Sequence, residues 1–345
     1  MIEIEPILER HSGEVERSLQ DLWVREIERS REYHPFIRGL YESAREFTLR
    51  GGMRIASFTT SMVSRGYGFG GGEPISAVCD AVELYRHSIL VHDDLVDGDD
   101  LRRGRPTIHR EYGEMRDERL GLGTSVFLGN ILYSMSIGRI LNSTLGCGTA
   151  SALVSELLRA NIEVNESQTL DVYMEGATPD RELWEIMASR RAASLFRATL
   201  RMGGILSGAK GDLDLLGRAG EEMGYVFDIQ DDIIDTLASR DDYGREPGSD
   251  LRTLKRPIHI IMAMERASPE QRANIGSPDA DLADVRELLS ETGALEESRK
   301  MADGHRTRAL ELLSSTEMDR ETQDIFCSLM EYIGKSLKWY GPTKG

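Results

Sequence analysis

Two clusters of the form Asp-Asp-x-x-Asp stand far apart in the sequence. Their members are Asp93, Asp94 and Asp97 in the first cluster and Asp231, Asp232 and Asp235 in the second. Residues four apart share one face of a helix, with Cβ atoms about 6 Å apart, so the outer aspartates of each cluster can converge on one ion. Carboxylate oxygens suit Mg²⁺ or Mn²⁺ better than zinc. Because Mg²⁺ is commonly held by carboxylates together with substrate phosphates, the two clusters predict several Mg²⁺ ions around a diphosphate.

Each cluster stands near the end of a long stretch with helical periodicity. Residues 75–97 contain neither glycine nor proline, and Val78, Val82, Tyr85 and Ile89 recur at spacings of four, three and four. The C-terminal end of a helix carries about −0.5 of a charge, so aspartates there are unfavourable without a cation. A solvated acidic helix end is the alternative for either cluster alone. Two matching clusters in apolar helices favour the metal site.

Two arginines, Arg102 and Arg103, follow the first cluster directly. A guanidinium group binds two phosphate oxygens at once, which makes arginine the natural partner of a diphosphate. As isolated surface arginines they would be unremarkable, but beside the aspartates they predict phosphate binding.

The composition disfavours several classes of partner. The chain has 345 residues and a net charge of −17, whereas nucleic acids and anionic membrane surfaces are bound by basic faces. We expect no nucleic-acid partner. The three cysteines are far apart and predict free thiols in a reducing compartment, and neither a signal peptide nor a transmembrane segment is expected. The predicted localisation is cytoplasmic.

The elements that must position the two clusters are helices. Long helices are predicted over residues 75–97, 149–175, 181–206 and 212–236, and shorter ones over 14–33, 124–145, 256–267, 281–313 and 321–339. Three glycines in the fourth stretch, Gly217, Gly220 and Gly224, would let neighbouring helices approach closely. No stretch alternates as a strand does. We expect a single all-α domain over residues 1–345, with a long polar loop at 239–257.

Three segments resemble the all-trans isoprenyl diphosphate synthases, the farnesyl and geranylgeranyl diphosphate synthase family. The first aspartate-rich motif of that family is similar to "HDDLVDGDDLRRGRPTIH" (92–109), the second to "GYVFDIQDDIID" (224–235), and the lysine-bearing segment after it to "GSDLRTLKRPIHIIMA" (248–263). Order and spacing agree over residues 40–270. The resemblance implies an isoprenoid synthase-type helical bundle with a central cavity, and a homodimer.

The resemblance also implies roles for individual residues. The implied metal ligands for three Mg²⁺ ions are Asp93, Asp97 and Asp231, supported by Asp94, Asp232 and Asp235. The implied contacts to an allylic prenyl diphosphate are Arg102 and Lys255, and Gln168 and Arg191 are further candidate substrate-binding residues. The aspartates that bind metal and Lys255 would promote ionisation of the allylic carbon–oxygen bond. In the family, the double bond of isopentenyl diphosphate then attacks the cation, and the released diphosphate removes a proton.

The chain departs from the family pattern in the segment that binds the acceptor substrate. Where the family has Gly-Gly-Lys-x-x-Arg, this chain has "GGMRIA", so Met53 replaces the lysine and Ala56 the arginine. Arg86 stands where histidine or glutamine is common. Losing two charge-assisted hydrogen bonds, at about 1.5–3 kcal/mol each, would cost about 3–6 kcal/mol of binding free energy. Further departures are Arg191-Ala192 for Lys-Thr and Phe227-Asp228 for Phe-Gln.

Three hypotheses follow from the broken acceptor half. The first is a short-chain isoprenyl diphosphate synthase whose acceptor site is rebuilt around Arg54, Arg86 and Arg103. The second is a terpene synthase, or a prenyltransferase with another acceptor, which ionises the allylic diphosphate without isopentenyl diphosphate. The third is a non-catalytic subunit that modulates a partner, and the intact aspartates weigh against it.

The length of the hydrocarbon chain depends on the helix before the first cluster. In the family, residues on this helix floor the hydrocarbon tunnel. Ser88 is small and stands five residues before Asp93, and Tyr85 lies about one turn deeper. This hints at a C15–C20 chain that ends at Tyr85. The alternative is that Tyr85 is an ordinary core residue.

Overall fold

The computed structural model describes residues 2–177, 180–239 and 247–335. The elements are α1 (Glu5–Ser30), α2 (Pro35–Thr48), α3 (Ile55–Gly66), α4 (Glu73–Val96), β1 (Leu101–Arg102), β2 (Arg105–Pro106), α5 (Ile108–Met115), α6 (Glu118–Leu141), α7 (Cys147–Met174), α8 (Arg181–Ala188), α9 (Ala192–Ser207), the 3₁₀ turn η1 (Lys210–Asp212), α10 (Leu213–Leu237), α12 (Ser249–Arg252), α13 (Ile258–Arg266), α14 (Pro269–Ile275), α15 (Leu282–Thr292), α16 (Ala294–Ser314) and α17 (Arg320–Lys335). The predicted all-α class is confirmed.

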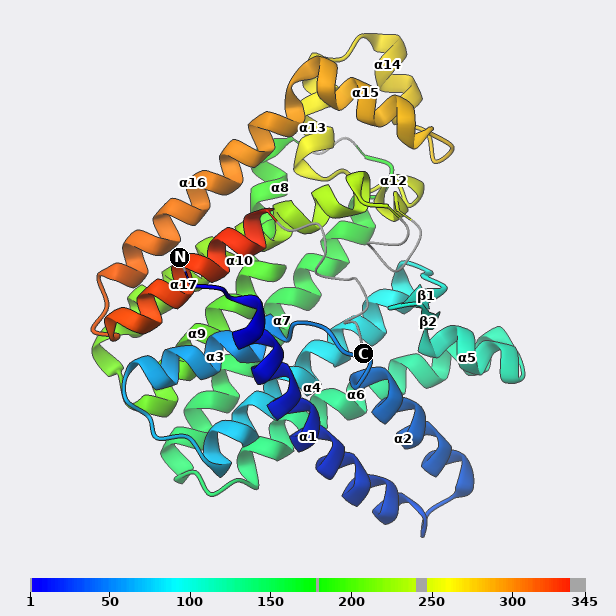
Figure 1. Ribbon diagram of the computed structural model, residues 1–345. Helices are drawn as coiled ribbons and strands as arrows, with labels where there is room; N and C mark the ends of the chain where they lie inside the picture. The colour runs from blue at the N-terminus through cyan, green and yellow to red at the C-terminus, as the bar shows by residue number, and fades with distance from the viewer. Residues whose placement is uncertain (1, 178–179, 240–246, 336–345) are drawn as a thin grey trace.

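Helices α4 and α10, which carry the aspartate clusters, run through the middle of the bundle (Figure 1). Helix α4 packs along α6, and α10 packs along α9 and α16. In the view of Figure 1, α1 and α2 lie at the bottom, and α13 to α15 lie at the top beyond the end of α10. The predicted apolar stripe of α4 is buried, with Val78, Val82 and Tyr85 fully covered.

Close helix contacts at two glycines bring α9 against α10, as predicted from the glycine spacing. A Cβ atom at Gly224 would overlap the backbone of Ala193, and one at Gly220 would overlap the backbone of Phe196 and Arg197. These contacts matter for the site because they fix the start of α9 beside the second aspartate cluster.

Two predicted helices are each divided in the structure. The stretch 181–206 breaks between Ala188 and Ala192, and the stretch 281–313 breaks at Gly293, whose φ is 67°. Gly293 explains the second break, because a left-handed residue ends a helix. The first has no glycine or proline, so local sequence could not predict it. The C-terminal end of the predicted helix 321–339 and much of the predicted loop 239–257 lie outside the described residues.

The sequence also failed to predict a small hairpin. Strands β1 and β2 pair antiparallel, with Arg102 opposite Arg105. The turn between them contains Arg103 and Gly104, both at positive φ. Two-residue turns with positive φ at both positions are the ones that fit a hairpin. The hairpin sets Arg102 and Arg103 on opposite sides of a tight bend, and their side chains reach different parts of the site.

Helix α6 is long and apolar enough to cross a membrane, judged by length and composition alone, although the sequence predicted no such segment. Core helices of soluble proteins pass the same test. Only 39% of its most apolar 18-residue window is buried. On its outer side Leu122 and Phe127 are 57% and 66% exposed. The helix therefore presents an apolar surface that the rest of the described chain does not cover.

Candidate active site

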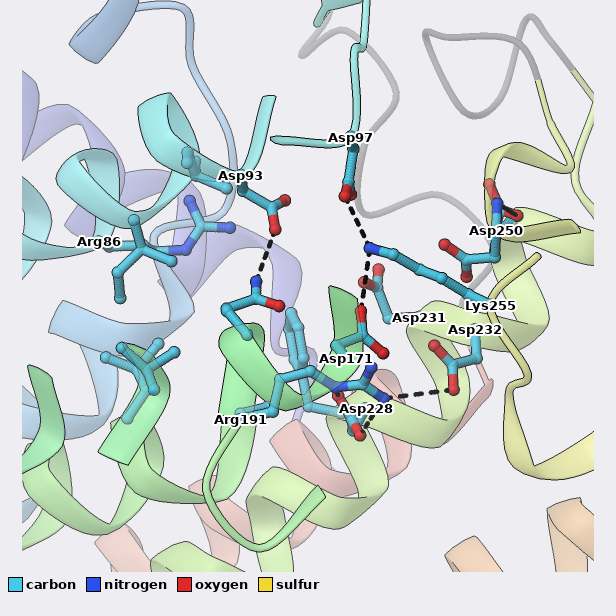
Figure 2. A pocket seen from close by; sticks show the side chains of 18 of the residues that line it. Arg86, Asp93, Asp97, Asp171, Arg191, Asp228, Asp231, Asp232, Asp250 and Lys255 are labelled. Atoms are coloured by element: carbon cyan, nitrogen blue, oxygen red, sulfur yellow. Dashed lines mark hydrogen bonds and ion pairs between the residues drawn. The ribbon is translucent and has the colours of Figure 1, made fainter. Parts of the chain in front are cut away.

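One cavity of about 170 Å³ collects both aspartate clusters between the ends of α4, α7 and α10. Eight aspartates line it: Asp93, Asp97, Asp171, Asp228, Asp231, Asp232, Asp235 and Asp250. Four cationic side chains line it as well: Arg86, Arg102, Arg191 and Lys255. Figure 2 shows Asp93 and Asp97 facing Asp231 and Asp232, with the ammonium group of Lys255 among these carboxylates and Arg86 to one side of them. Among the described residues, eight carboxylates against four cations leave an excess of negative charge in a confined space.

Residues of the first cluster are held by side chains from two distant segments. Asp93 Oδ1 accepts a hydrogen bond of 2.7 Å from Gln168 Nε2 on α7. Asp97 Oδ1 lies 2.7 Å from Lys255 Nζ, which also lies 3.1 Å from Asp171 Oδ2. Lys255 is only 11% exposed, so one ammonium group stands between two largely buried carboxylates (Figure 2). The protein's own lysine thus partly neutralises the cluster.

Two predicted metal residues have structural partners of their own. Asp94 is 1% exposed, and its Oδ1 accepts a 2.7 Å hydrogen bond from Arg102 Nε. Asp235 accepts hydrogen bonds from the backbone of Ser249 and Asp250 through its two carboxylate oxygens, both at 3.3 Å. Asp94 therefore orients Arg102, and Asp235 anchors the start of α12. Both roles agree with a supporting rather than a direct part in ligand binding.

The break before α9 aims Arg191 into the cavity. Its guanidinium group makes two hydrogen bonds of 2.7 Å to the two carboxylate oxygens of Asp228 and lies 3.6 Å from Asp232 Oδ2. Such a bidentate pair fixes the position of both groups. The departures that the sequence showed at these two positions, arginine for lysine and aspartate for glutamine, therefore form one interacting pair.

Burial makes this concentration of carboxylates unfavourable. Burial, together with the neighbouring Asp93, raises the pKa of Asp97 to about 7, although Lys255 opposes the shift. Burial likewise raises the pKa of Asp94 to about 6 against the effect of Arg102. It raises the pKa of Asp232 well above the usual range despite Arg191. Raised values mean that the ionised carboxylates lack sufficient positive charge.

The residues present fit a divalent cation. The buried Oδ2 atom of Asp232 makes no hydrogen bond among the described residues. All the candidate ligands are hard carboxylate oxygens, as Mg²⁺ prefers. Within the described ranges no three acidic, histidine or cysteine side chains already stand together as a metal site. Lys255, Arg102 and Arg191 instead hold the carboxylates in separate ion pairs, so ligand binding must rearrange some of them.

The chain matches a known protein family over most of its length. The family model described as polyprenyl synthetase matches residues 38–292. The chain belongs to the polyprenyl synthetase family. It is 30% identical over 257 residues to the geranylfarnesyl diphosphate synthase of Natronomonas pharaonis, which covers 73% of each chain. It is 28% identical over 240 residues to a short chain isoprenyl diphosphate synthase of Methanocaldococcus jannaschii, covering 68% of this chain and 69% of that one.

The fold of this polyprenyl synthetase agrees with solved structures. A crystal structure of geranylgeranyl pyrophosphate synthase from Corynebacterium glutamicum, complexed with isoprenyl diphosphate and magnesium, superposes with a TM-score of 0.88 at 21% identity. The match covers 97% of this chain and 99% of that chain. The predicted isoprenoid synthase-type bundle is therefore confirmed, and the chain is homologous to prenyltransferases.

The remaining predicted residues of this polyprenyl synthetase lie in three other places. Arg54 and Arg103 line a second cavity, which shares Arg86 with the first. Ser88 lines a cavity of about 500 Å³ between α4, α6 and α7. Tyr85, three residues before Ser88 on α4, is fully buried, with its ring centre 6.0 Å from that of Tyr133. The cavity that Ser88 lines shares Asp93 and Gln168 with the aspartate cavity, so the three cavities adjoin one another.

Sequence reasoning missed three acidic residues of the cavity: Asp171, Asp228 and Asp250. Asp171 is three residues after Gln168 on α7, and both side chains contact the first cluster or its lysine. The sequence did contain one usable signal for Asp171, because this acidic residue continues the apolar face of a predicted helix. Asp250 lies fifteen residues after Asp235 in the sequence, and its position in the cavity depends on the tertiary fold.

The raised pKa values predict how stability of the metal-free protein changes with pH. A carboxyl group whose pKa is higher in the folded state binds more protons when folded, so stability falls as pH rises between its unfolded and folded values. Asp97 and Asp94, at about 7 and about 6, both act in this direction. We expect the melting temperature in EDTA to fall between about pH 4 and pH 7, the span between the unfolded and folded pKa values of these two groups. Thermal unfolding of wild type and Asp97→Asn across this range measures it; the variant should show a smaller fall, and an equal fall would contradict the assignment.

Proposed function

We propose that the protein is a Mg²⁺-dependent prenyltransferase of the isoprenyl diphosphate synthase type, with a short-chain product. It ionises an allylic prenyl diphosphate and condenses it with isopentenyl diphosphate. The observation that carries the proposal is the single cavity in which two Asp-Asp-x-x-Asp clusters face each other beside arginine and lysine side chains. Family membership and the resemblance of both motifs support it.

The proposed donor site uses the aspartates and cations in different roles. Asp93, Asp97 and Asp231 would hold three Mg²⁺ ions, which supply positive charge to the leaving diphosphate and for which Mn²⁺ can substitute. Lys255 and Arg102 already contact carboxylates of the first cluster. A diphosphate bound beside these carboxylates could accept hydrogen bonds from the same two side chains. These cations stabilise the charge that develops as the carbon–oxygen bond breaks. Gln168 orients Asp93 through the hydrogen bond that it already makes.

The acceptor is tested by omitting it. With Mg²⁺ and farnesyl or geranylgeranyl diphosphate, a longer prenyl diphosphate should form only when isopentenyl diphosphate is present. A hydrocarbon or alcohol formed without isopentenyl diphosphate would establish the terpene synthase alternative instead. The observation that keeps this alternative open is the loss of cationic side chains at Met53 and Ala56. No consumption of the allylic diphosphate under either condition would overturn both functions.

Chain length gives a separate prediction. We propose that the hydrocarbon passes Ser88 and ends at Tyr85, which is fully buried and whose hydroxyl has no hydrogen-bond partner among the described residues. Replacing Tyr85 with alanine removes the ring and should lengthen the main product by at least one five-carbon unit. Chromatography of the dephosphorylated products measures this. Tyr85→Phe keeps the ring and is the matched control; an unchanged product in Tyr85→Ala would show that Tyr85 is only a core residue.

We propose that the apolar outer side of α6 and α7 forms a homodimer interface. Its exposed apolar residues are Leu122, Phe127 and Leu141 on α6 and Leu158, Ile162 and Val172 on α7. A second copy would cover them and close the cavity that Ser88 lines. Phe127→Glu should convert the dimer into a monomer in light scattering after gel filtration, because a charge in an apolar interface core is strongly unfavourable. Tyr33→Glu, at an 80% exposed position on the turn after α1, should leave the dimer intact.

A further inference from the structure

The second cavity is lined by arginines and apolar side chains, and no carboxylate of the described residues lines it. Its lining is Met53, Arg54, Ile55, Ala56, Arg86, Arg103, Ala192, Leu195, Phe196 and Phe227. It shares Arg86, Ala192, Leu195 and Phe227 with the aspartate cavity, so the two cavities meet. A molecule bound here would have an anionic group near the arginines and an apolar body facing the reacting carbon.

Arg54 does not contribute a free charge to this cavity. Its side chain is 1% exposed and lies 3.0 Å from Glu83, which is equally buried, and 3.5 Å from Glu16. A further hydrogen bond of 3.0 Å goes to the carbonyl oxygen of Thr48. Burial would raise the pKa of Glu83, but the charge of Arg54 overrides it and lowers the value to about 2. Glu83 is therefore ionised, and Arg54 serves to hold the loop at residues 51–54.

Arg86 and Arg103 have no carboxylate partner among the described residues. Across the described part of the chain, neither guanidinium group lies within ion-pair distance of a carboxylate, and Arg103 donates a hydrogen bond only to the carbonyl oxygen of Gly51. The Arg103 guanidinium lies against Gly52, where any Cβ atom would overlap it. Burial, with the charges of Arg86 and Arg54, lowers the pKa of Arg103 to about 9, which still leaves it protonated at neutral pH. Two uncompensated cations side by side provide an anion site.

The charge of this site matches one phosphate group. A phosphate monoester carries about −1.5 to −2 at pH 7, which two guanidinium groups neutralise and bind bidentately. A second phosphate would bring further charge, and the places from which a lysine and an arginine could reach it are held by Met53 and Ala56. We propose that this pocket recognises a single phosphate group through Arg86 and Arg103, so that an isopentenyl acceptor with one phosphate is used about as well as one with two.

This inference rests on the proposed prenyl transfer, and its chemistry balances without a new reactant. The allylic carbon–oxygen bond breaks, and its electron pair leaves with the diphosphate. The acceptor double bond supplies the pair for the new carbon–carbon bond. One proton passes from the acceptor to the released diphosphate. An acceptor with one phosphate therefore gives a longer prenyl monophosphate.

Two measurements test the inference. In EDTA, where no metal can hold a diphosphate among the aspartates, calorimetric titration with isopentenyl monophosphate and isopentenyl diphosphate should give dissociation constants within about fivefold of each other. One additional charge-assisted hydrogen bond is worth about 10- to 150-fold in affinity, so a preference for the diphosphate above about 50-fold would overturn the proposal. With Mg²⁺ and geranyl diphosphate, kcat/KM for the two acceptors should agree within about tenfold by the same reasoning.

Variants sharpen the test. Arg86→Gln should weaken both acceptors equally, whereas Met53→Lys should strengthen the diphosphate by about tenfold or more and leave the monophosphate unchanged. Met53→Leu is the matched control and should change neither. If neither acceptor is prenylated, the proposed function fails while the ratio of the two dissociation constants still decides this inference. If only the diphosphate binds, the inference fails and the proposed function stands.

Discussion

Replacing Asp93 with asparagine is expected to lower kcat/KM by about 10³-fold or more while leaving the metal-free protein at least as stable as wild type. Asparagine is nearly isosteric with aspartate, and its amide oxygen can still accept the 2.7 Å hydrogen bond from Gln168. The change removes one negative charge from the group that faces the diphosphate. If a metal ion supplies several kcal/mol of stabilisation to the leaving group, its loss corresponds to this factor.

The stability half of this prediction separates a catalytic role from a structural one. Asp93 raises the pKa of Asp97 by repulsion, second only to burial, so its neutralisation relieves a strain of the metal-free state. The melting temperature of Asp93→Asn in EDTA should therefore equal or exceed that of wild type, while kcat/KM measured with Mg²⁺ should fall sharply. Asp100→Asn is the matched control, because Asp100 belongs to the same motif but its side chain is 67% exposed and pairs with Arg110. Full activity in Asp93→Asn, or a large drop in its melting temperature, would contradict a metal-binding role.

The sequence predicted the chemistry of the site better than its geometry. The two aspartate clusters could be recognised because the spacing of four and the position at a helix end are local features, whereas the choice of Asp93, Asp97 and Asp231 as direct ligands came from the family resemblance. Their convergence in one cavity depends on how α4 and α10 cross, which no local pattern encodes. Lys255 could be placed in the site by motif resemblance, but its contacts with Asp97 and Asp171 needed the tertiary fold.

On the acceptor side, the sequence showed the charge of each candidate residue but not its partner in the fold. Arg54 was predicted as a substitute for the missing cations because only its charge and its place beside Met53 were known. The structure pairs it with Glu83 at 3.0 Å in the core. An acidic residue inside the apolar stretch 75–97 was the one available signal that some nearby arginine had an internal partner. The partners of Arg191 and Asp228 were equally unpredictable, because two separate departures from the motif form one bidentate pair only in the folded chain.

Replacing Lys255 with methionine is expected to destabilise the metal-free protein and to make its stability depend on Mg²⁺. In wild type the ammonium group lies 2.7 Å from Asp97 and 3.1 Å from Asp171, and the three side chains are 8–14% exposed. Removing one partner from a buried ion pair leaves an uncompensated charge and commonly costs about 3–5 kcal/mol. The variant should therefore melt at a lower temperature in EDTA, and catalysis should also fall, because a cation that contacts the diphosphate is lost.

The effect of Mg²⁺ alone distinguishes this explanation from a simple packing defect. In wild type, the ammonium group of Lys255 already stands between Asp97 and Asp171, so Mg²⁺ without a diphosphate should raise the melting temperature only slightly. In Lys255→Met the two carboxylates are free to bind a divalent cation, and Mg²⁺ should restore much of the lost stability by binding the folded state. Mn²⁺ titration followed by electron paramagnetic resonance should likewise show tighter binding to the variant. Lys255→Arg keeps the charge and should behave like wild type in both measurements. If Mg²⁺ fails to restabilise Lys255→Met, the lysine does not occupy the place of a cation, and its contacts with the aspartates contribute only to packing.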